Sequence, residues 1–593
     1  MKRKIKMILK AVREYKIYAI LTPIFMLFEA GMECFIPWMM TNLVGDMRTA
    51  NGLGDIWFDI VILLGMGIVS ILAGILGGIT AARASTGLAR NLREDLYKKL
   101  QSFSFANIDR FSTSSLVTRM TTDVTNTQQA FQMCIRIVIR APLMLIFSIV
   151  MAFMTGGPAA FIFICVIPFI VLGLFFIVKN AMPIFKSVFK RYDALNESVQ
   201  ENVSGIRVVK SYVREDYEKQ KFNAASNSMT IDFIKAEKIL ALNNPLMNTS
   251  IHVSNLLIIG IGSYLILSNS PNYDATKNVI TYTDMSPEKM SALITYGIQV
   301  LMSLMMISMV LVMLVMSLEC VERIGEVLEE EPTIHNPLNP IYEVKDGSVI
   351  FKDVNFKYKE NAEKNALSDI NLNIKSGQFI GIIGSTGSGK TSLVNLVSRL
   401  YDVSEGEVFV GGIDVKQYDL KTLRDNVAVV LQKNLLFSGT IESNLKWGDI
   451  NASEEDMKKA CQIAQADEFI ESFPDKYQTK IEQGGTNVSG GQKQRLCIAR
   501  AILKKPKILI LDDSTSAVDT KTDCLIRKGL KEVIPETTKI VIAQRISSIE
   551  DADQIIVLDN GMISNIGTHE ELLKTSQIYQ DVYYSQNKKG GNE

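Results

Sequence analysis

The sequence has 593 residues, which is more than a single hydrophobic core normally supports, so at least two domains are expected. Hydrophobic residues make up 47% of the chain and charged residues 21%, while the formal net charge is zero. This balance argues against a nucleic-acid partner, which would favour a basic excess. It predicts instead one apolar compartment and one water-soluble compartment.

Six apolar stretches in the first half are each about 20 residues long, the length needed to cross a bilayer. Basic residues gather at the N-terminus, between the second and third stretches, and between the fourth and fifth. By the positive-inside rule, we expect a multi-pass protein of the plasma (inner) membrane with both termini in the cytoplasm. The spans are placed near Tyr18–Met40, Trp57–Ile79, Ile137–Thr155, Ala159–Val178, Met247–Leu267 and Met290–Ser317.

Polar residues inside the spans are candidates for function because they are costly in a bilayer. Glu29 and Glu33 lie four residues apart, on one face of the first span, and have either a cavity-lining role or a pairing or interfacial role. Tyr296 and Gln299 lie in the sixth span, and His252, in the fifth, is expected to be a packing residue. The sixth span is also rich in methionine, which suits either an adaptable binding surface or plain packing; the residues concerned are Met302, Met305, Met306, Met309, Met313 and Met316.

After Cys320 the composition changes. A Glu-rich and Pro-containing segment follows, and from Ser348 short β-rich runs alternate with helical patterns, as expected for an α/β domain. We therefore expect a helical transmembrane domain over residues 1–320, a linker over 321–345 and a nucleotide-binding domain over 346–593.

The strongest motif is a phosphate-binding loop, G-x-x-x-x-G-K-[ST], between an expected strand at Phe379–Ile383 and an expected helix at Ser392–Leu400. Its glycines let backbone N–H groups point at phosphate oxygens. Lys390 is expected to reach the β- and γ-phosphates of ATP, and Thr391 to ligate Mg²⁺. The residues expected to hold the nucleotide here are Gly384, Ser385, Thr386, Gly387, Ser388, Gly389, Lys390, Thr391 and Ser392.

A second motif is the apolar run Ile508–Leu511, which ends in Asp512 and Asp513. Downstream of a phosphate loop, a buried strand with this ending predicts that Asp512 holds Mg²⁺. The chemistry expected from both motifs is that of a P-loop nucleotide-binding domain.

A third motif identifies a family. Ser489, Gly490, Gly491 and Gln492, followed by Lys-Gln-Arg, match the signature of ATP-binding cassette (ABC) proteins. Several further segments stand in the order that this family has, and the six spans precede them, so the chain resembles an ABC exporter half-transporter over essentially its whole length. These segments are Gln432 (Q-loop), Ser516–Asp519 (D-loop), Tyr358 (an adenine-stacking aromatic) and Gly567–Leu572 (a C-terminal motif).

The resemblance implies an all-α six-helix transmembrane domain followed by an α/β P-loop (RecA-like) ABC ATPase domain. It implies Mg²⁺ held by Thr391, Gln432 and Asp512, and two ATPase domains paired head to tail. Each ATP then touches the phosphate loop of one chain and the signature of the other. By the same analogy, the cytoplasmic helical extensions couple the domains through tips near Asp109–Arg119 and Glu201–Arg214.

Two expected catalytic positions depart from the family. Where the family usually has Glu after the magnesium-binding Asp, this chain has Asp513, which is one methylene shorter. Such a displacement, about 1 Å, can cost about a hundredfold in rate. Where the family usually has a switch His, this chain has Gln544, whose amide cannot carry a proton or a charge. Both changes in one site resemble the weak subunit of a heterodimeric multidrug exporter.

We therefore expect ATP-driven export of amphipathic small molecules, such as drugs or lipids and with tolerance for cations, together with a second half-transporter that carries Glu and His at the matching positions. The alternative is an ATP-gated channel or a regulatory membrane subunit that binds ATP without pumping. The six spans argue against the soluble ABC ATPases, and an importer is disfavoured because importer ATPases are usually separate chains.

Overall fold

The computed structural model describes residues 1–47, 53–268, 272–274, 279–281, 285–514 and 517–587. By its internal contacts the chain forms two compact units. Residues Met1–Gln101 and Thr113–Glu330 form a helical unit, and residues Ser102–Ser112 and Glu331–Glu593 form an α/β unit. A short piece of the first half of the chain, Ser102–Ser112, therefore belongs to the second unit.

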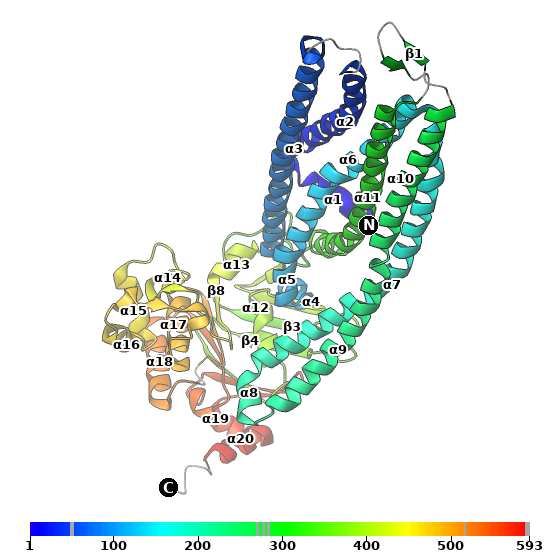
Figure 1. The fold of residues 1–593 in the computed structure, drawn as a ribbon. Helices are drawn as coiled ribbons and strands as arrows, with labels where there is room; N and C mark the ends of the chain where they lie inside the picture. Colours follow the sequence, from blue (N-terminus) through cyan, green and yellow to red (C-terminus); the bar gives the residue numbers. More distant parts are fainter. Residues whose placement is uncertain (48–52, 269–271, 275–278, 282–284, 515–516, 588–593) are drawn as a thin grey trace. The chain divides into compact units, whose positions relative to one another are not determined.

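Long helices build the helical unit (Figure 1). Its core brings α6 against α2 and α11, and buries Phe163, Ile258, Leu293 and Tyr296 between the helices. The helices are α1 (Lys2–Lys10), α2 (Lys16–Met47), α3 (Leu53–Ser102), α5 (Thr113–Thr118), α6 (Val124–Gly156), α7 (Phe161–Ser204), α8 (Ile206–Ser211), α9 (Glu215–Leu240), α10 (Asn243–Ser268) and α11 (Pro287–Glu329), and a small hairpin of β1 (Asn272–Asp274) and β2 (Val279–Thr281) precedes α11.

Five helical stretches of the described residues are long and apolar enough to cross a membrane. One of them, Thr113–Ile184, is 72 residues long and holds both α6 and α7, which a 3-10 turn at Gly157–Ala160 joins. Each predicted span lies within the helices of the structure, except that the fourth begins in that turn. The sixth lies within α11 but extends beyond Leu311, where the last apolar stretch ends. The other stretches are Arg13–Met47, Gly54–Ser102, Glu215–Ser268 and Pro287–Leu311.

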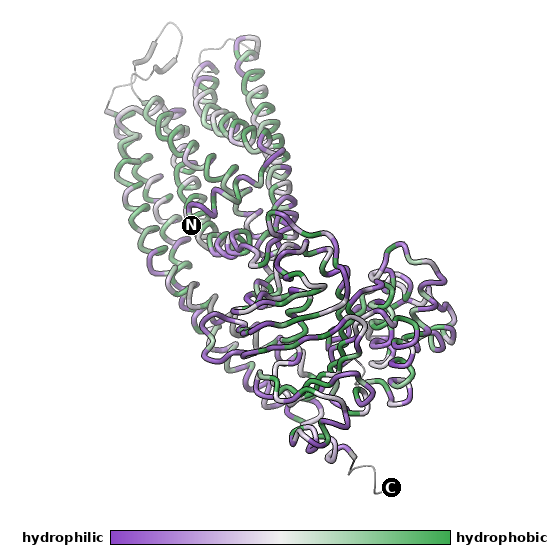
Figure 2. Tube along the Cα trace, turned by 180° about the vertical axis from the view of Figure 1, so that it is seen from behind, coloured by the Kyte–Doolittle hydropathy of each residue, from purple (hydrophilic) through white to green (hydrophobic). Residues whose placement is uncertain are grey.

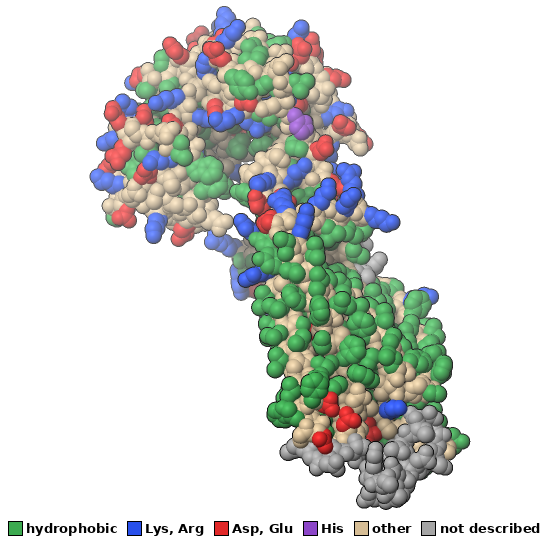
Figure 3. Space-filling model, turned by 90° about the horizontal axis from the view of Figure 1, so that it is seen from above, with side chains coloured by type: hydrophobic (Ala, Val, Ile, Leu, Met, Phe, Trp, Pro, Cys, Tyr) green, Lys and Arg blue, Asp and Glu red, His purple; other side chains and the backbone are tan. Residues whose placement is uncertain are grey.

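The outer surface of the helical unit is apolar. On α3 alone, Trp57, Phe58, Leu64 and Ile71 are more than half exposed, whereas small residues such as Ala81 and Ala84 are buried. Figures 2 and 3 show the same hydrophobic cover along the long helices, in contrast to the mixed charges of the α/β unit. A soluble protein rarely exposes so much contiguous apolar surface, so this cover fits lipid.

Several helices are longer than a bilayer requires. With 50 residues, α3 extends about 75 Å at 1.5 Å per residue, whereas the hydrocarbon core is about 30 Å thick. The spanning helices therefore continue past the membrane, as their apolar spacing predicts. Each of the two long connections contains a short helix near its expected tip. In the first connection, α4 (Phe105–Arg110) begins four residues before the expected tip at Asp109–Arg119. In the second, α8 (Ile206–Ser211) lies within the expected tip at Glu201–Arg214.

Two sheets form the α/β unit. A six-stranded sheet has the order β14-β13-β5-β12-β11-β8, parallel except for β14, and a four-stranded antiparallel sheet has the order β4-β3-β6-β7. The strands are β3 (Val349–Phe356), β4 (Leu367–Ile374), β5 (Phe379–Gly384), β6 (Glu405–Val410), β7 (Ile413–Asp414), β8 (Val427–Val430), β11 (Ile508–Asp512), β12 (Thr538–Ile542), β13 (Gln554–Asp559) and β14 (Met562–Gly567), with a separate pair of β9 (Gly439–Thr440) and β10 (Lys480–Ile481).

The central strands are buried on both faces, which explains their continuous apolar sequences. On β11, Ile508 and Ile510 pack into the core shared with α12 and the antiparallel sheet, while Leu509 and Leu511 pack into the core shared with the other helices. The helices are α12 (Lys390–Val397), α13 (Leu420–Asn426), α14 (Ile441–Leu445), α15 (Glu454–Ile463), α16 (Asp467–Ser472), α17 (Gly490–Leu503), α18 (Thr520–Val533), α19 (His569–Thr575) and α20 (Gln577–Asn587). A helical domain followed by an α/β domain is thus confirmed.

Candidate functional site

One edge of the parallel sheet gathers the predicted nucleotide residues. The phosphate loop follows β5, Asp512 ends β11 and Asp513 comes next, and Gln432 and Gln544 each lie two residues beyond β8 and β12. These four strands run parallel and are consecutive in the sheet. Because the carboxyl ends of parallel strands meet at one edge, motifs up to 160 residues apart converge there.

The phosphate loop needs its glycines. A Cβ on Gly384 would lie 2.1 Å from the carbonyl oxygen of Leu558, and Gly389 has a φ of +95°, in the left-handed region that side chains disfavour. The Nζ of Lys390 curls back over the loop and donates to the carbonyl oxygens of Gly384 at 2.9 Å and Ser385 at 2.7 Å. Burial lowers the pKa of Lys390, and the nearby carboxylates oppose that change. The loop therefore presents a lysine beside the N-terminus of α12, where an anion is favoured.

Two oxygen ligands of the kind that Mg²⁺ prefers lie side by side. The hydroxyl of Thr391 donates to Oδ2 of Asp512 at 2.9 Å. Burial raises the pKa of the Asp512 carboxyl, and the Thr391 hydrogen bond opposes the rise. A buried carboxylate next to a hydroxyl fits a hard cation, which would replace the hydrogen between them. The donor set thus fits the expected metal.

The expected catalytic pair is joined by a hydrogen bond. Nε2 of Gln544 donates to Oδ2 of Asp513 at 2.7 Å, and Gln432 hydrogen-bonds the same carboxylate. Asp513 is 9% exposed and has a φ of +50°, and its backbone N–H donates to the carbonyl oxygen of Ile542 at 3.1 Å. Burial raises the pKa of the Asp513 carboxyl, and the hydrogen bonds from Gln432 and Gln544 oppose the rise. Two neutral amides therefore surround this carboxylate.

The signature residues begin α17. Ser489 is the N-cap, and Gln492 completes a capping box: its Oε1 accepts from the Ser489 N–H at 2.9 Å. Ser489 and Gly490 are exposed, and Gly491 and Gln492 are half-buried. The same helix contacts the expected D-loop, because the Ala517 N–H donates to Oε1 of Gln494 at 3.1 Å. The signature is thus an exposed helix N-terminus.

The remaining family segments are placed as follows. Tyr358 is 46% exposed, and its hydroxyl lies 2.8 Å from Oγ of Ser392, two residues after the phosphate-loop lysine. Ser516, the first residue of the expected D-loop, lies outside the described residues. His569, in the C-terminal motif, contacts the hydroxyl of Tyr579 through Nδ1 at 2.7 Å. That histidine is therefore engaged within its own C-terminal segment, as its position in the sequence indicated.

Comparisons with known proteins agree with this arrangement. Residues 19–287 match the family model of the ABC transporter transmembrane region, and residues 367–516 match that of the ABC transporter. The chain is 33% identical over 591 residues to an uncharacterized ABC transporter ATP-binding protein of Bacillus subtilis (strain 168), YfiB, covering 99% of each. It is 34% identical over 547 residues to one of Mycobacterium tuberculosis, Rv1273c, covering 91% of this chain and 90% of the relative.

The chain belongs to the ABC transporter family. Its fold resembles that of a bacterial Atm1-family ABC exporter with ATP bound, with a TM-score of 0.80 and 23% identity over 97% of this chain and 98% of that one. The α/β unit is accordingly an ABC ATPase domain that binds ATP, and its hydrolysis of ATP is coupled to transport across a membrane. The helical unit is the transmembrane domain of this multi-pass protein.

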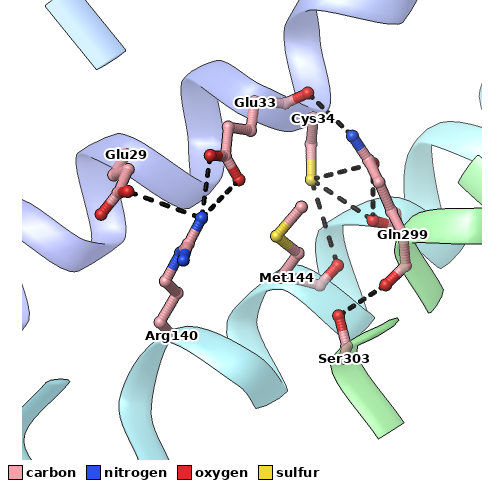
Figure 4. Close-up of polar contacts among 8 residues, drawn as sticks. Glu29, Glu33, Cys34, Arg140, Met144, Gln299 and Ser303 are labelled. Atoms are coloured by element: carbon pink, nitrogen blue, oxygen red, sulfur yellow. Dashed lines mark hydrogen bonds and ion pairs between the residues drawn. The ribbon is translucent and has the colours of Figure 1, made fainter. Parts of the chain in front are cut away.

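The transmembrane domain of the transporter contains a polar cluster (Figure 4). Glu29 and Glu33 of α2 both point at Arg140 of α6, whose Nη2 lies 2.8 Å from both carboxylate oxygens of Glu33 and 3.5 Å from Oε1 of Glu29. From α11, Gln299 donates to the carbonyl oxygen of Glu33 at 3.1 Å and accepts from Ser148 at 3.0 Å. Of the alternatives for the glutamates, the structure therefore favours pairing for Glu33.

Arg140 is the residue of this cluster that sequence reasoning missed. A signal was available, since Arg140 is a charged residue inside the third predicted span. Its pairing with Glu33 bears on the expected tolerance for cations, because a substrate cation would compete with a guanidinium for the same carboxylate. Two buried atoms of the cluster, Oε2 of Glu29 and Nε of Arg140, have no hydrogen-bond partner in the described part of the chain. Tyr296 lies alongside and donates to the carbonyl oxygen of Cys34 at 3.0 Å.

Proposed function

We propose that this transporter exports amphipathic small molecules, drugs or lipids among them, across the plasma membrane, and that the ATP site built on its own phosphate loop hydrolyses ATP slowly. The observation that carries the second part is the 2.7 Å hydrogen bond from Gln544 to Asp513. The chain then acts as one half of a dimer whose other half carries the competent catalytic residues. We also propose the domain limits given above, with the transmembrane domain at 1–320 and the nucleotide-binding domain at 346–593.

ATP, when bound with Mg²⁺, supplies the phosphoanhydride bond whose hydrolysis drives the transport cycle. The phosphate-loop amides and Lys390 hold the phosphates, and Tyr358 stacks on the base. Thr391 and Asp512 hold the metal, and Gln432 completes the set of metal-binding side chains. The hydroxyl and carboxylate that would hold it already lie 2.9 Å apart, which supports this assignment.

The slow site follows from the surroundings of Asp513. A base that activates water has to reach the water with a free lone pair, and here one carboxylate oxygen accepts from the Gln544 amide. The side chain is also one methylene shorter than glutamate, and a displacement of about 1 Å can lower the rate about a hundredfold. Gln544 donates a neutral hydrogen bond but cannot carry the positive charge of an imidazolium. The pair is suited to holding ATP rather than to hydrolysing it.

The signature is available to a second chain. Ser489 and Gly490 are exposed at the start of α17, where backbone N–H groups and the helix dipole favour a phosphate. In a head-to-tail pair, Ser489 and the Gly490 and Gly491 amides would meet the γ-phosphate held by the partner, with Gln492 as the capping residue. The partner is expected to carry Glu and His where this chain has Asp513 and Gln544.

The nature of the cargo rests on the transmembrane domain. Met302, Met305, Met306 and Met309 of α11 are all more than a third exposed in the chain by itself, and methionine adapts to many shapes. Together with the polar cluster at Glu33 and Arg140, this helix offers apolar area and charge, which an amphipathic molecule would match. Basic residues next to the spans support cytoplasmic termini.

Two substitutions in the full transporter, purified with its partner and reconstituted into vesicles, test the asymmetric cycle. Gly490→Asp should nearly abolish ATP turnover, because a carboxylate would meet the phosphate in the competent site. Asp513→Asn should leave more than about half of the turnover, since little hydrolysis depends on it. If Asp513→Asn stops turnover and the chain alone hydrolyses ATP briskly, Asp513 is an ordinary catalytic base and the proposal is wrong. ATP-dependent ion conductance without accumulation of cargo would favour a channel instead.

A further inference from the structure

Four aromatic rings of the α/β unit form a continuous cluster, which we call the ring cluster: Phe105, Phe356, Tyr358 and Tyr401. Tyr401 is at its centre, with its ring centroid 5.2 Å from that of Tyr358, 5.6 Å from that of Phe356 and 6.0 Å from that of Phe105. The rings of Tyr401 and Tyr358 meet edge to face at 88°, a favourable geometry for an aromatic pair. Tyr401 thus touches both the expected adenine platform and a residue of α4.

A hydrogen bond strengthens the contact with α4. The hydroxyl of Tyr401 donates to Oδ2 of Asp109 at 2.6 Å, across 292 positions of sequence. Burial and the neighbouring Asp109 carboxylate both raise the pKa of Tyr401, so its hydroxyl keeps its proton and remains a donor. Asp109 itself is exposed, so without this bond water would solvate it.

The segment that carries Asp109 is tied to the ATPase domain elsewhere as well. Ser104 and Asn107 form a capping box at the start of α4, and the Asn107 side chain donates to the carbonyl oxygen of Glu331 at 2.9 Å. The Ser104 hydroxyl lies 2.6 Å from that of Thr333. These bonds connect residues 102–112 to the linker at Glu331 and Thr333. The Tyr401 bond connects them instead to the ring cluster, which contains Tyr358.

At its other end the ring cluster reaches the phosphate loop. Phe356 is 2% exposed and its ring lies 4.8 Å from that of Tyr358, so Tyr358 packs on a fixed neighbour. The Tyr358 hydroxyl lies 2.8 Å from Oγ of Ser392. Tyr358 is 46% exposed, so part of the residue is available to a ligand, and its contacts include the ring cluster and Ser392 of α12.

We infer that Tyr401 is a positioning residue through which a purine base stacked on Tyr358 sets the placement of α4. The inference rests on the proposed role of Tyr358. Closely packed rings cannot move independently of one another. A base that fixes the position of Tyr358 therefore also fixes Tyr401 and, through its hydroxyl, Asp109. The triphosphate alone, bound at the phosphate loop, reaches Tyr358 only through the Ser392 contact and places no base on its ring. The base, and not only the phosphates, thereby affects residues 102–112, which lie between α3 and α5 in the sequence.

Hydrogen exchange of the full-length transporter in lipid nanodiscs tests the inference with two probes: ATP with Mg²⁺, and inorganic tripolyphosphate with Mg²⁺. Both should slow exchange in peptides of the phosphate loop, Gly384–Ser392. ATP should slow exchange in residues 102–112 by about fivefold more than tripolyphosphate does, which is the scale of one net hydrogen bond. An equal response of residues 102–112 to both probes overturns the inference.

Variants separate the hydroxyl from the ring. Tyr401→Phe keeps the packing and removes the donor, so ATP should still protect the phosphate loop while residues 102–112 lose their extra protection. Asp109→Ala should act in the same way, whereas Asp109→Asn keeps an acceptor oxygen and should retain the response. Tyr342→Phe, at a tyrosine that is 70% exposed, is the matched control and should behave as the wild type. A wild-type response in Tyr401→Phe contradicts the inference.

One further variant distinguishes this inference from the proposed function. Tyr358→Ala should weaken ATP binding about tenfold, the order of one lost base–aromatic stack, and leave tripolyphosphate binding unchanged. If Tyr358→Ala leaves ATP affinity intact, the base platform is wrong and the inference fails with it. If Tyr358→Ala weakens ATP binding but Tyr401→Phe keeps the base-dependent response, only the role of Tyr401 is wrong.

Discussion

Nε2 of Gln544 donates a hydrogen bond to Oδ2 of Asp513 at 2.7 Å, although the two residues belong to different strand ends of the sheet. From the resemblance, Glu and His are expected where Asp513 and Gln544 stand, and in the structure these two side chains contact each other. The Gln544 amide hydrogen-bonds the shorter carboxylate of Asp513 but, being neutral, adds no positive charge to the site. The first prediction follows from this pair.

Restoring the family residues should raise hydrolysis. In the chain purified without its partner, Asp513→Glu combined with Gln544→His should increase kcat by about a hundredfold, because the carboxylate regains its reach and the switch position regains a titratable ring. Steady-state phosphate release checks the result. Asp475→Glu, at an exposed aspartate of the same domain, is the control for the added methylene. An unchanged kcat in the double variant would show that the limitation lies elsewhere.

The ion pair of the transmembrane domain should stabilise the fold only as a pair. Arg140→Gln removes the guanidinium that both Glu33 and the buried Glu29 contact, so we expect a loss of about 1–3 kcal/mol in the free energy of unfolding. Adding Glu33→Gln should recover much of that loss. Thermal unfolding in detergent measures both variants.

Arg191 supplies the comparison for Arg140, because Arg191→Gln removes a guanidinium whose side chain is 47% exposed and leaves the buried Asp232 its ion pair with Lys235. This change should cost less than about 1 kcal/mol. A double Arg140/Glu33 variant that is as unstable as the single one would mean that Arg140 acts through packing rather than charge.

Membrane topology can be mapped with thiol reagents. In a variant whose native cysteines are replaced, Asn51→Cys and Asn272→Cys should react with an impermeant maleimide added to intact cells, because both lie in connections that the charge distribution places outside. Ser211→Cys, at the end of α8, should react only after the membrane is opened. Protection of both outer positions would reverse the orientation.

Local patterns in the sequence determined the elements and the chemistry of this protein. Each of these patterns can be recognised within a short window of sequence: the apolar run before Asp512, the glycines of the phosphate loop and the 20-residue apolar stretches. A buried parallel strand has to be apolar throughout, and a span has to be apolar over the thickness of the bilayer. The nucleotide site could be predicted because parallel strands bring their carboxyl ends together whatever the loops do.

Tertiary packing decided which side chains meet. Arg140 bonds Glu33 across 107 positions and Tyr401 bonds Asp109 across 292, and neither pair has a spacing that a sequence pattern could reveal. Gln544 could have pointed to solvent, and only the adjacency of β11 and β12 turns its amide toward Asp513. Hydrogen bonds act over about 3 Å, so partners distant in sequence depend on how helices and strands pack, which no local window of sequence contains.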